Sequence, residues 1–245
     1  MDVTFVGCGD AFGSGGRLNT CIHVRAARTI FLIDCGASSL IGLRRLGIDR
    51  NAIDTILVSH FHADHFGGIP FFMLDAQFNA KRTRALTIAG PPGLREWFVR
   101  AMETAFAGAS RTAQKFELIL VELTAWERRS LGELNVQAAP VRHAPTNGPF
   151  FAYRIEAEGR TIAFSGDTEW VESLVEIARD ADLFITECYS FDRKVPFHID
   201  YATLAANLPR ISAKRLILTH MNEDTLKRVG ATGRELAEDG LTIKL

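Results

Sequence analysis

Four side chains able to bind a metal ion lie within one six-residue segment, His60-Phe61-His62-Ala63-Asp64-His65. In an extended or turn segment, His60 and His62 point in the same direction because they are two residues apart. Asp64 and His65 follow where a helix is expected to begin, so they can aim at a neighbouring point. We therefore expect two imidazoles to converge on one metal ion, and a carboxylate and a third imidazole on a second. A histidine-rich surface turn is the less favoured interpretation, because ligand clusters of this density are usually functional.

Further metal-binding side chains follow apolar segments elsewhere in the chain. His60 comes after TILVS, His143 after AAPVR, Asp167 after TIAFSG and His220 after RLILT. The ends of strands are rigid, and the loops that leave them commonly hold functional residues. Because the chain has only seven histidines, ligands at four separate strand ends indicate one composite site.

These ligands need a framework of strands and helices to bring them together. Apolar segments predict strands at residues 3–7, 21–24, 29–34, 56–58, 86–89, 115–123, 134–141, 150–157, 160–164, 182–186 and 215–219. Helices are expected at 38–46, at 94–106 with Pro92 in its first turn, between Thr168 and about 178, and at 201–208; residues 69–79 form a helix or a loop. Strands in meander order come first, and strands alternating with helices follow. This order predicts an α/β fold of four layers, αββα, with two sheets packed face to face.

The composition is typical of a single catalytic domain, which we expect to comprise residues 1–245. The chain of 245 residues is 47% hydrophobic, which supports a large core, and its formal charge of −1 gives no basic surface of the kind that binds nucleic acid. With no signal-like segment and no apolar run of 18 residues, we expect a cytoplasmic enzyme without a membrane partner. The scattered Cys8, Cys21, Cys35 and Cys188 are expected to be reduced and mostly buried.

Three other features receive structural interpretations. The glycine-rich segment 7–20 is not followed by a helix with dinucleotide spacing, so a tight loop is favoured over a phosphate cradle. His23 lies inside a predicted strand and is interpreted as structural. The phenylalanines of residues 69–79 indicate core or a dimer surface, which leaves a homodimer open.

The motifs now show a family resemblance that extends over nearly the whole sequence. HxHxDH at 60–65, a lone His143, SGDT around Asp167 and LTH at 218–220 resemble, in this order, the metallo-β-lactamase superfamily. TIAGPPGL at 87–94, the FSGDT form of the aspartate motif, ITEC at 185–188 and His198 are similar to its ribonuclease Z and phosphodiesterase branch.

The resemblance implies a single-domain metallo-β-lactamase-like sandwich with two divalent metal ions. By position, His60, His62 and His143 would hold the first ion. Asp64, His65 and His220 would hold the second, and Asp167 would bridge the two. Zn²⁺ is the expected ion, with Mn²⁺ or Fe²⁺ as alternatives, since imidazole and carboxylate ligands accommodate all three.

Such a ligand set is suited to hydrolysis. Two divalent ions about 3.5–4 Å apart can share a bridging hydroxide, which is available near neutral pH. The motifs contain no cysteine ligand, whereas a structural zinc site is usually closed by four ligands with thiolates among them. Besides the ligand Asp64, we expect two further catalytic residues: His198, which would face the leaving group as a general acid or hydrogen-bond donor, and Glu187, which would orient it.

The substrate is inferred from what the chain does not contain. Ribonuclease Z-like enzymes usually insert an extended arm for transfer RNA between the GPxG helix and the counterpart of His143, but here residues 94–142 are used by a helix and strands. We therefore expect a small phosphodiester or cyclic phosphate as substrate, and no nucleic acid partner. The alternatives are a ribonuclease Z-like tRNA 3′ processing endonuclease, a thioester or lactone hydrolase, and a non-enzymatic sensor that retains metal.

Overall fold

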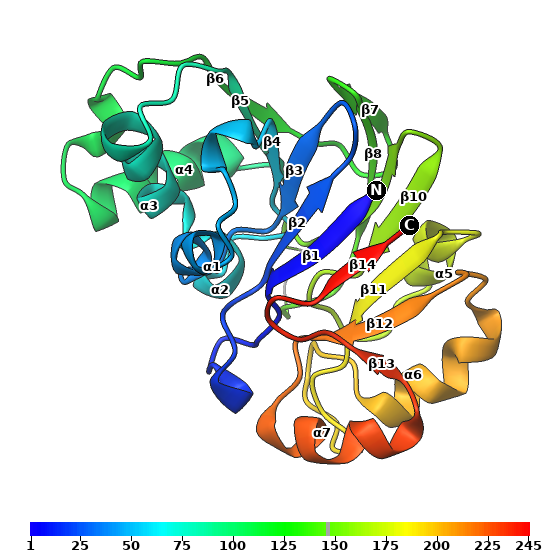
Figure 1. Ribbon diagram of the computed structural model, residues 1–245. Coiled ribbons are helices and arrows are strands. Elements are labelled where there is room, and N and C mark those ends of the chain that lie inside the picture. The colour runs from blue at the N-terminus through cyan, green and yellow to red at the C-terminus, as the bar shows by residue number, and fades with distance from the viewer. Residues whose placement is uncertain (146–147) are drawn as a thin grey trace.

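Two mixed sheets packed face to face form the centre of the molecule. The computed structural model describes residues 1–145 and 148–245. In this part of the chain each sheet has seven strands, and helices cover the outer face of both sheets (Figure 1). Figure 1 shows α1 to α4 on one side and α5 to α7 on the other. The predicted four-layer αββα architecture is confirmed.

Each sheet is antiparallel in one half and parallel in the other. The first sheet has the spatial order β14 (Thr242–Lys244), β1 (Asp2–Gly7), β2 (Cys21–Arg25), β3 (Ile30–Ile33), β4 (Thr55–Leu57), β5 (Leu86–Gly90) and β6 (Leu118–Glu122). The second has the order β13 (Glu235–Leu236), β12 (Leu216–Thr219), β11 (Leu183–Glu187), β10 (Arg160–Phe164), β9 (Phe151–Ala157), β8 (Leu134–Pro140) and β7 (Arg128–Leu131). The parallel halves run from β3 to β6 and from β10 to β13.

Most helices are short. The α-helices are α1 (Ser39–Arg45), α2 (Ala63–Phe66), α3 (Ile69–Leu74), α4 (Leu94–Ala105), α5 (Ser173–Ala178), α6 (Tyr201–Asn207) and α7 (Glu223–Arg228). A π-helical turn, η3 (Asp75–Asn79), continues α3. Single 3₁₀ turns are η1 (Ser14–Gly16), η2 (Arg50–Ala52), η4 (Ala109–Arg111), η5 (Leu208–Arg210) and η6 (Val229–Thr232).

Alternation along the strands creates three apolar cores. In β3, Phe31 and Ile33 are buried between the two sheets, whereas Leu32 packs on the helix side with Leu43 of α1. Successive strand residues face opposite sides of a sheet, so a strand buried on both faces is apolar throughout. A third core lies between the second sheet and α5 and α6. Each of the three cores thus lies between two neighbouring layers of the four-layer fold.

The structure differs from the sequence prediction in a few elements. Pro92 does not lie in the first turn of α4, because the helix begins after an N-cap at Gly93, whose φ of 90° requires glycine. The helix expected to follow Thr168 starts only at Ser173. Strands β7, β13 and β14 and helix α7 were not predicted. β14 pairs with β1, so the two ends of the chain lie side by side (Figure 1).

Two expectations from composition can be compared with the structure. All four cysteines are free and buried, as predicted. Within residues 1–145 and 148–245, no helix has the length and apolar character needed to cross a membrane.

Candidate metal centre

The predicted metal ligands lie together at the ends of strands from both sheets. His60 follows β4 of the first sheet, while the other three strand-end ligands follow β8, β10 and β12 of the second. Four groups of possible ligand atoms form there, each with all its atoms within 4.8 Å of one another; two consist of the predicted ligands alone, and the other two include His198. The first comprises His60, His62 and His143; the second comprises Asp64, His65, Asp167 and His220. These are the two sets that the resemblance implied.

Local backbone geometry separates the four ligands of the HxHxDH segment. His62 is the N-cap of α2 and has an extended conformation, with φ of −66° and ψ of 150°. Asp64 and His65 lie inside that helix, so they leave the backbone in another direction. The imidazole rings of His60 and His62 have centroids only 4.7 Å apart. One short strand-to-helix turn thus supplies ligands to both groups.

Asp167 is a member of the second group and also faces the first. Its Oδ1 is 3.2 Å from His65 Nε2, and its Oδ2 is 3.2 Å from His220 Nε2. The same Oδ2 lies 3.7 Å from Nε2 of His143, a member of the first group. The carboxylate therefore faces both sets of ligands. Its role as a bridging ligand stays a prediction.

Three buried imidazole nitrogens indicate that the cluster is built for cations. His60 Nε2, His65 Nε2 and His220 Nδ1 make no well-aligned hydrogen bond among the described residues, although His65 Nε2 lies within ion-pair distance of Asp167. A buried polar atom without a partner costs free energy. Neutral imidazoles and carboxylates are ligands that divalent ions accept, and coordination would satisfy buried nitrogens of this kind. The residues present thus fit divalent metal ions.

The first group is kept in the neutral form that metal binding needs. Burial lowers the pKa of His60 and of His62, the most exposed member of the group, and it lowers the pKa of His143 to about 4. These imidazoles are therefore unprotonated at neutral pH, and a metal ion would not have to displace protons from them.

In the second group, the carboxylates determine whether the histidines are protonated. Burial opposes the protonation of His220, but the carboxylates of Asp167 and Asp64 outweigh it and raise its pKa to about 9. Burial likewise works against the charge on Asp167, yet His220 and His65 hold the pKa of that carboxyl well below its usual range. Protons on these imidazoles occupy the place that a divalent cation would take beside two carboxylates.

Three groups that orient the ligands were not identified from the sequence. Asp34 Oδ2 accepts a hydrogen bond from His65 Nδ1 at 2.6 Å, and the Phe197 carbonyl accepts one from His143 Nδ1 at 3.0 Å. The Ser59 hydroxyl lies 3.0 Å from His60 Nδ1. Such bonds fix the ring orientation and leave Nε2 directed at the metal position. Asp34 and Phe197 have positive φ values of 60° and 67°, which the amino-acid types did not indicate.

His198 lies beside the ligand cluster without being part of the two ligand groups described above. Its Nδ1 donates a hydrogen bond of 3.0 Å to Glu187 Oε2, and the other oxygen of Glu187 accepts one from the Thr168 N–H. Glu187 is fully buried at the end of β11, whereas His198 is in a loop, as expected. The predicted pairing of these two side chains is therefore present in the structure, while their catalytic roles stay predictions.

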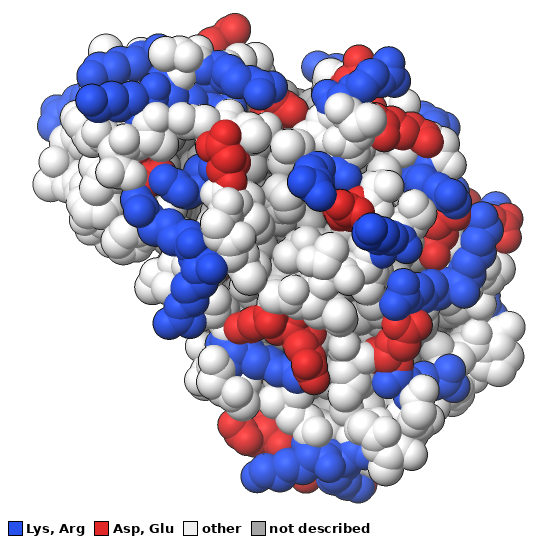
Figure 2. Space-filling model, viewed as in Figure 1, with Lys and Arg blue, Asp and Glu red and all other residues white. Residues whose placement is uncertain are grey.

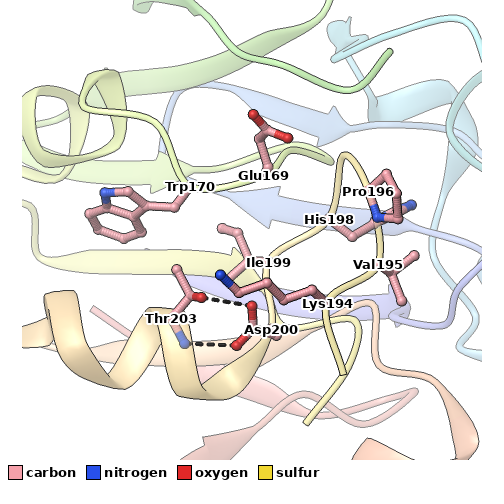
Figure 3. Close-up of a pocket in the computed structure, with 9 residues that line it drawn as sticks. All are labelled: Glu169, Trp170, Lys194, Val195, Pro196, His198, Ile199, Asp200 and Thr203. Carbon is pink, nitrogen blue, oxygen red and sulfur yellow. Dashed lines mark hydrogen bonds between the residues drawn. The ribbon is translucent and has the colours of Figure 1, made fainter. Parts of the chain in front are cut away.

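Two cavities meet at the loop that contains His198. A cavity of about 320 Å³ opens over the ligand cluster. The ligands that line it are His62, Asp64, His143, Asp167 and His220, and the rest of its lining is Ala11, Phe12, Tyr189, Val195, Pro196 and His198. A second, of about 290 Å³, lies behind residues 194–198 (Figure 3). Figure 3 shows Glu169 and Trp170 at its edge and Thr203 of α6, whose N–H and hydroxyl donate to the carboxylate of Asp200. Only the first cavity contains the ligand cluster.

His23 is the one histidine outside this region. It lies in β2 and is buried, and it lines a different cavity with Asp2 and Arg25. This position agrees with the structural role expected for it. The six other histidines all belong to the ligand cluster or its margin.

Comparison with known proteins agrees with this architecture. Residues 1–240 match the sequence model of the family described as anti-Pycsar protein Apyc1. A protein named Ribonuclease Z from Mycobacterium bovis is 27% identical over 244 residues, which cover 90% of this chain and 85% of that protein. The crystal structure of human tRNase Z, short form (ELAC1), superposes with a TM-score of 0.80 and 26% identity over 100% of this chain and 99% of that one.

A diphosphatase from the PhnP family has the same fold, with a TM-score of 0.79, 20% identity and coverage of 100% of this chain and 97% of that one. Together these similarities confirm the metallo-β-lactamase superfamily and its ribonuclease Z and phosphodiesterase branch.

Proposed function

Because this chain belongs to the family of the anti-Pycsar protein Apyc1, within the metallo-β-lactamase superfamily, we propose that it is a metal-dependent phosphodiesterase. Its substrate is a small phosphodiester or a cyclic phosphate. The observation that supports this proposal most directly is the arrangement of two ligand groups on either side of one carboxylate, that of Asp167. The expected content is two divalent ions, with zinc as the first choice.

The roles of the individual residues follow from their chemistry. When bound, divalent ions lower the pKa of coordinated water and neutralise negative charge on a phosphoryl oxygen. His60, His62 and His143 would hold one ion, and Asp64, His65 and His220 the other. Asp167, whose carboxylate faces both ligand groups, would offset the repulsion between two dications. Asp64 would be a ligand of the second ion, and its carboxylate also places a negative charge at the base of the substrate cavity.

His198 and Glu187 would act on the leaving group. Since Nδ1 of His198 is engaged by Glu187, its Nε2 is the nitrogen left to donate a proton to the departing oxygen. Burial by itself lowers the pKa of His198, but the negative charge of the neighbouring Glu187 has the larger effect. The pKa of His198 is therefore raised, which favours the protonated imidazole. A positioned general acid contributes about 10²–10⁴ in rate.

The size of the site supports a small substrate. The cavity over the ligands measures about 320 Å³, near the lower end of the range of about 300–1,000 Å³ for small-molecule sites. Residues 94–142, the stretch in which a tRNA-binding arm would be inserted, contain α4, η4 and strands β6 to β8 of the two sheets, with the segments that connect them. Most of this stretch therefore contributes to the fold itself.

RNA is a second candidate substrate, and one finding favours it. The relatives named Ribonuclease Z match over most of their length, which argues against our expectation that nucleic acid is not a partner. Figure 2 shows Lys and Arg side chains gathered at the end of the molecule where β5 and β6 lie and along the same side below it, while both signs of charge are mixed on the opposite side of this view. A polyanion could contact such a surface.

A direct assay separates these functions. The protein, loaded with zinc or manganese, is tested on bis(p-nitrophenyl) phosphate, on a cyclic phosphodiester and on a precursor tRNA with a 3′ trailer. We expect hydrolysis of the small substrates, and its loss after treatment with a chelator. A His60→Gln variant should be inactive, whereas His23→Gln, the matched change outside the cluster, should keep its activity. Efficient, salt-sensitive cleavage of the tRNA trailer with weak activity on small diesters would favour the second candidate.

A further inference from the structure

Tyr189 packs against the predicted general acid, His198. The ring centroids of the two residues are 4.5 Å apart and their planes are inclined by 30°, so the phenol ring covers part of one imidazole face. Tyr189 is only partly buried, and it lines the cavity over the ligand cluster. It lies two residues after Glu187, whose carboxylate accepts the hydrogen bond from His198 Nδ1. One short segment after β11 therefore supplies two separate contacts to His198.

The backbone of Tyr189 is fixed on both sides of its peptide units. Its N–H donates to the carbonyl of Ile199 at 2.9 Å. Its own carbonyl accepts hydrogen bonds from the N–H of Asn222 and from the hydroxyl of Thr225, both at 2.9 Å. Because Ile199 directly follows His198, the first of these bonds also sets the distance between the phenol ring and the loop that contains the acid.

The loop that contains His198 gives its side chain little support. Val195, Pro196 and His198 line the cavity over the ligands and also the second cavity behind the loop (Figure 3). A segment with a cavity on each side has few packing neighbours to restrain it. The hydrogen bond from Nδ1 to Glu187 fixes one atom of the imidazole but leaves the ring free to swing about that atom. A contact on the ring face removes this freedom.

We propose that Tyr189 is a positioning residue, whose ring fixes the plane of the His198 imidazole so that Nε2 faces the departing oxygen. The inference rests on the proposed phosphodiesterase function and concerns its last step, in which Nε2–H gives its proton to that oxygen as the P–O bond breaks. A general acid acts only within hydrogen-bond reach of the atom it protonates. A misplacement of about 1 Å can cost about 10²-fold in rate.

Kinetics on two classes of leaving group test this role. Tyr189→Ala should lower kcat on an alkyl phosphodiester by about 10- to 100-fold while KM stays within about 3-fold. On bis(p-nitrophenyl) phosphate kcat should fall by about 3-fold at most, because this leaving group needs little protonation. Tyr189→Phe keeps the ring and should retain the wild-type values on both substrates. Tyr189→Leu keeps apolar bulk without a flat face and should resemble Tyr189→Ala.

A double variant shows whether Tyr189 acts through His198. Residues that work as a unit have strongly non-additive effects. In a His198→Ala background, the further change Tyr189→Ala should alter kcat on the alkyl substrate by about 2-fold at most, since no imidazole is left to position. If each change lowers kcat independently, Tyr189 has a function of its own and the inference is wrong.

Proton NMR of the substrate-free protein supplies a readout that does not depend on turnover. The proton on His198 Nδ1, held by Glu187, is identified by its absence from His198→Ala. Its signal should be sharp in the wild type and in Tyr189→Phe. In Tyr189→Ala it should broaden or disappear, because a mobile ring exchanges this proton with water. An unchanged signal in Tyr189→Ala would contradict the positioning role.

A second tyrosine provides the matched control. Tyr201 of α6 stacks on Phe191, with ring centroids 5.2 Å apart, and is not part of the cavity over the ligands. Tyr201→Ala should change neither the selectivity between the two leaving groups nor the Nδ1 signal. Metal content and thermal stability are measured for every variant, and metal content should equal that of the wild type.

The remaining outcomes separate this inference from the proposed function. Equal losses of kcat on alkyl and aryl substrates, or a raised KM with unchanged kcat, would assign Tyr189 to substrate contact and overturn the inference. A wild-type protein that hydrolyses no phosphodiester would disprove the proposed function instead. In that case the NMR comparison of Tyr189→Ala with Tyr189→Phe would still decide whether the phenol ring fixes His198.

Discussion

Oδ2 of Asp34 lies 2.6 Å from Nδ1 of His65, and both side chains are completely buried. The same carboxylate accepts hydrogen bonds from the N–H of Ser59 at 2.6 Å and from its hydroxyl at 2.8 Å. Asp34 thus connects the end of β3 with the loop after β4 and with α2. It orients one predicted ligand directly and supports the segment that contains three others.

Replacing Asp34 with Asn should weaken metal binding while preserving the backbone. Asn tolerates the positive φ of 60° found here, so the main change is the lost charge behind His65. Changes of this kind cost about 10- to 100-fold in metal affinity. Zinc affinity measured by competition with a chromophoric chelator checks this value. Asp192→Asn, at an exposed position, is the control, and an unchanged affinity in Asp34→Asn would show that the pair with His65 does not support the ligand.

Asp167→Ala should reduce the metal content of both sites. Its carboxylate faces both ligand groups, and without it the repulsion between two dications a few ångströms apart is not offset. Elemental analysis after dialysis should give a total of well under one ion per chain, because both sites lose metal. A variant that retains two ions would disprove the bridging role. Loss of a single ion would assign Asp167 to one site only.

His198→Ala should separate metal binding from leaving-group chemistry. We expect metal content to stay at the wild-type level, because the two sets of predicted ligands remain complete. The value of kcat should fall by about 10²–10⁴ on alkyl phosphodiesters and far less on aryl ones, whose leaving groups need little protonation. Parallel kinetics on the two substrate types measure this difference, and Glu187→Gln should produce a weaker effect in the same direction. Equal losses on both substrates would assign His198 to substrate positioning.

His23 should make the fold sensitive to mild acid. Burial, and then the charge of Arg25, lower its pKa to about 4, from about 6.5 in the unfolded chain. Between these values the unfolded state binds more protons than the folded state, so the free energy of unfolding should fall as the pH decreases from about 6.5 to 4. A shift of this size corresponds to at most about 3.5 kcal/mol.

Urea unfolding of the metal-free protein at pH 7 and pH 5 measures this effect. The His23→Gln variant cannot titrate at this position, so it should lose less stability than the wild type over the same interval. The ligand histidines contribute equally to both proteins and cancel in the comparison. An identical pH dependence in wild type and variant would contradict the prediction.

The sequence allowed the ligand cluster and the layer order to be predicted, because both depend on local patterns. His60, Asp167 and His220 each follow an apolar strand, and the end of a buried strand is recognisable from a few residues. Alternation in β3 likewise reflects burial on two faces. Strand β7 was not predicted, because it is short and three of its four residues are exposed, so it lacks an apolar pattern.

The orienting residues could not be predicted because their partners are set by tertiary structure. Asp34 approaches His65 because β3 and β4 are parallel neighbours, with Ile33 opposite Leu57. The sequence gives no information on that register. The carbonyl of Phe197 depends on a left-handed backbone conformation that phenylalanine rarely adopts. β14 also escaped prediction, since its partner is the first strand of the chain.

The pairing of β14 with β1 also determines the order in which the protein can fold. It joins Asp2 to Lys244, so the edge of the first sheet is completed only when two segments far apart in the sequence have met. Contacts between such distant segments require closure of a very long loop, and folds rich in them form slowly. His220 follows all the other predicted ligands in the chain. The ligand cluster is therefore complete only after the segment with His220 has joined those with His60 and His143, and earlier intermediates would meet metal ions with an incomplete set of ligands.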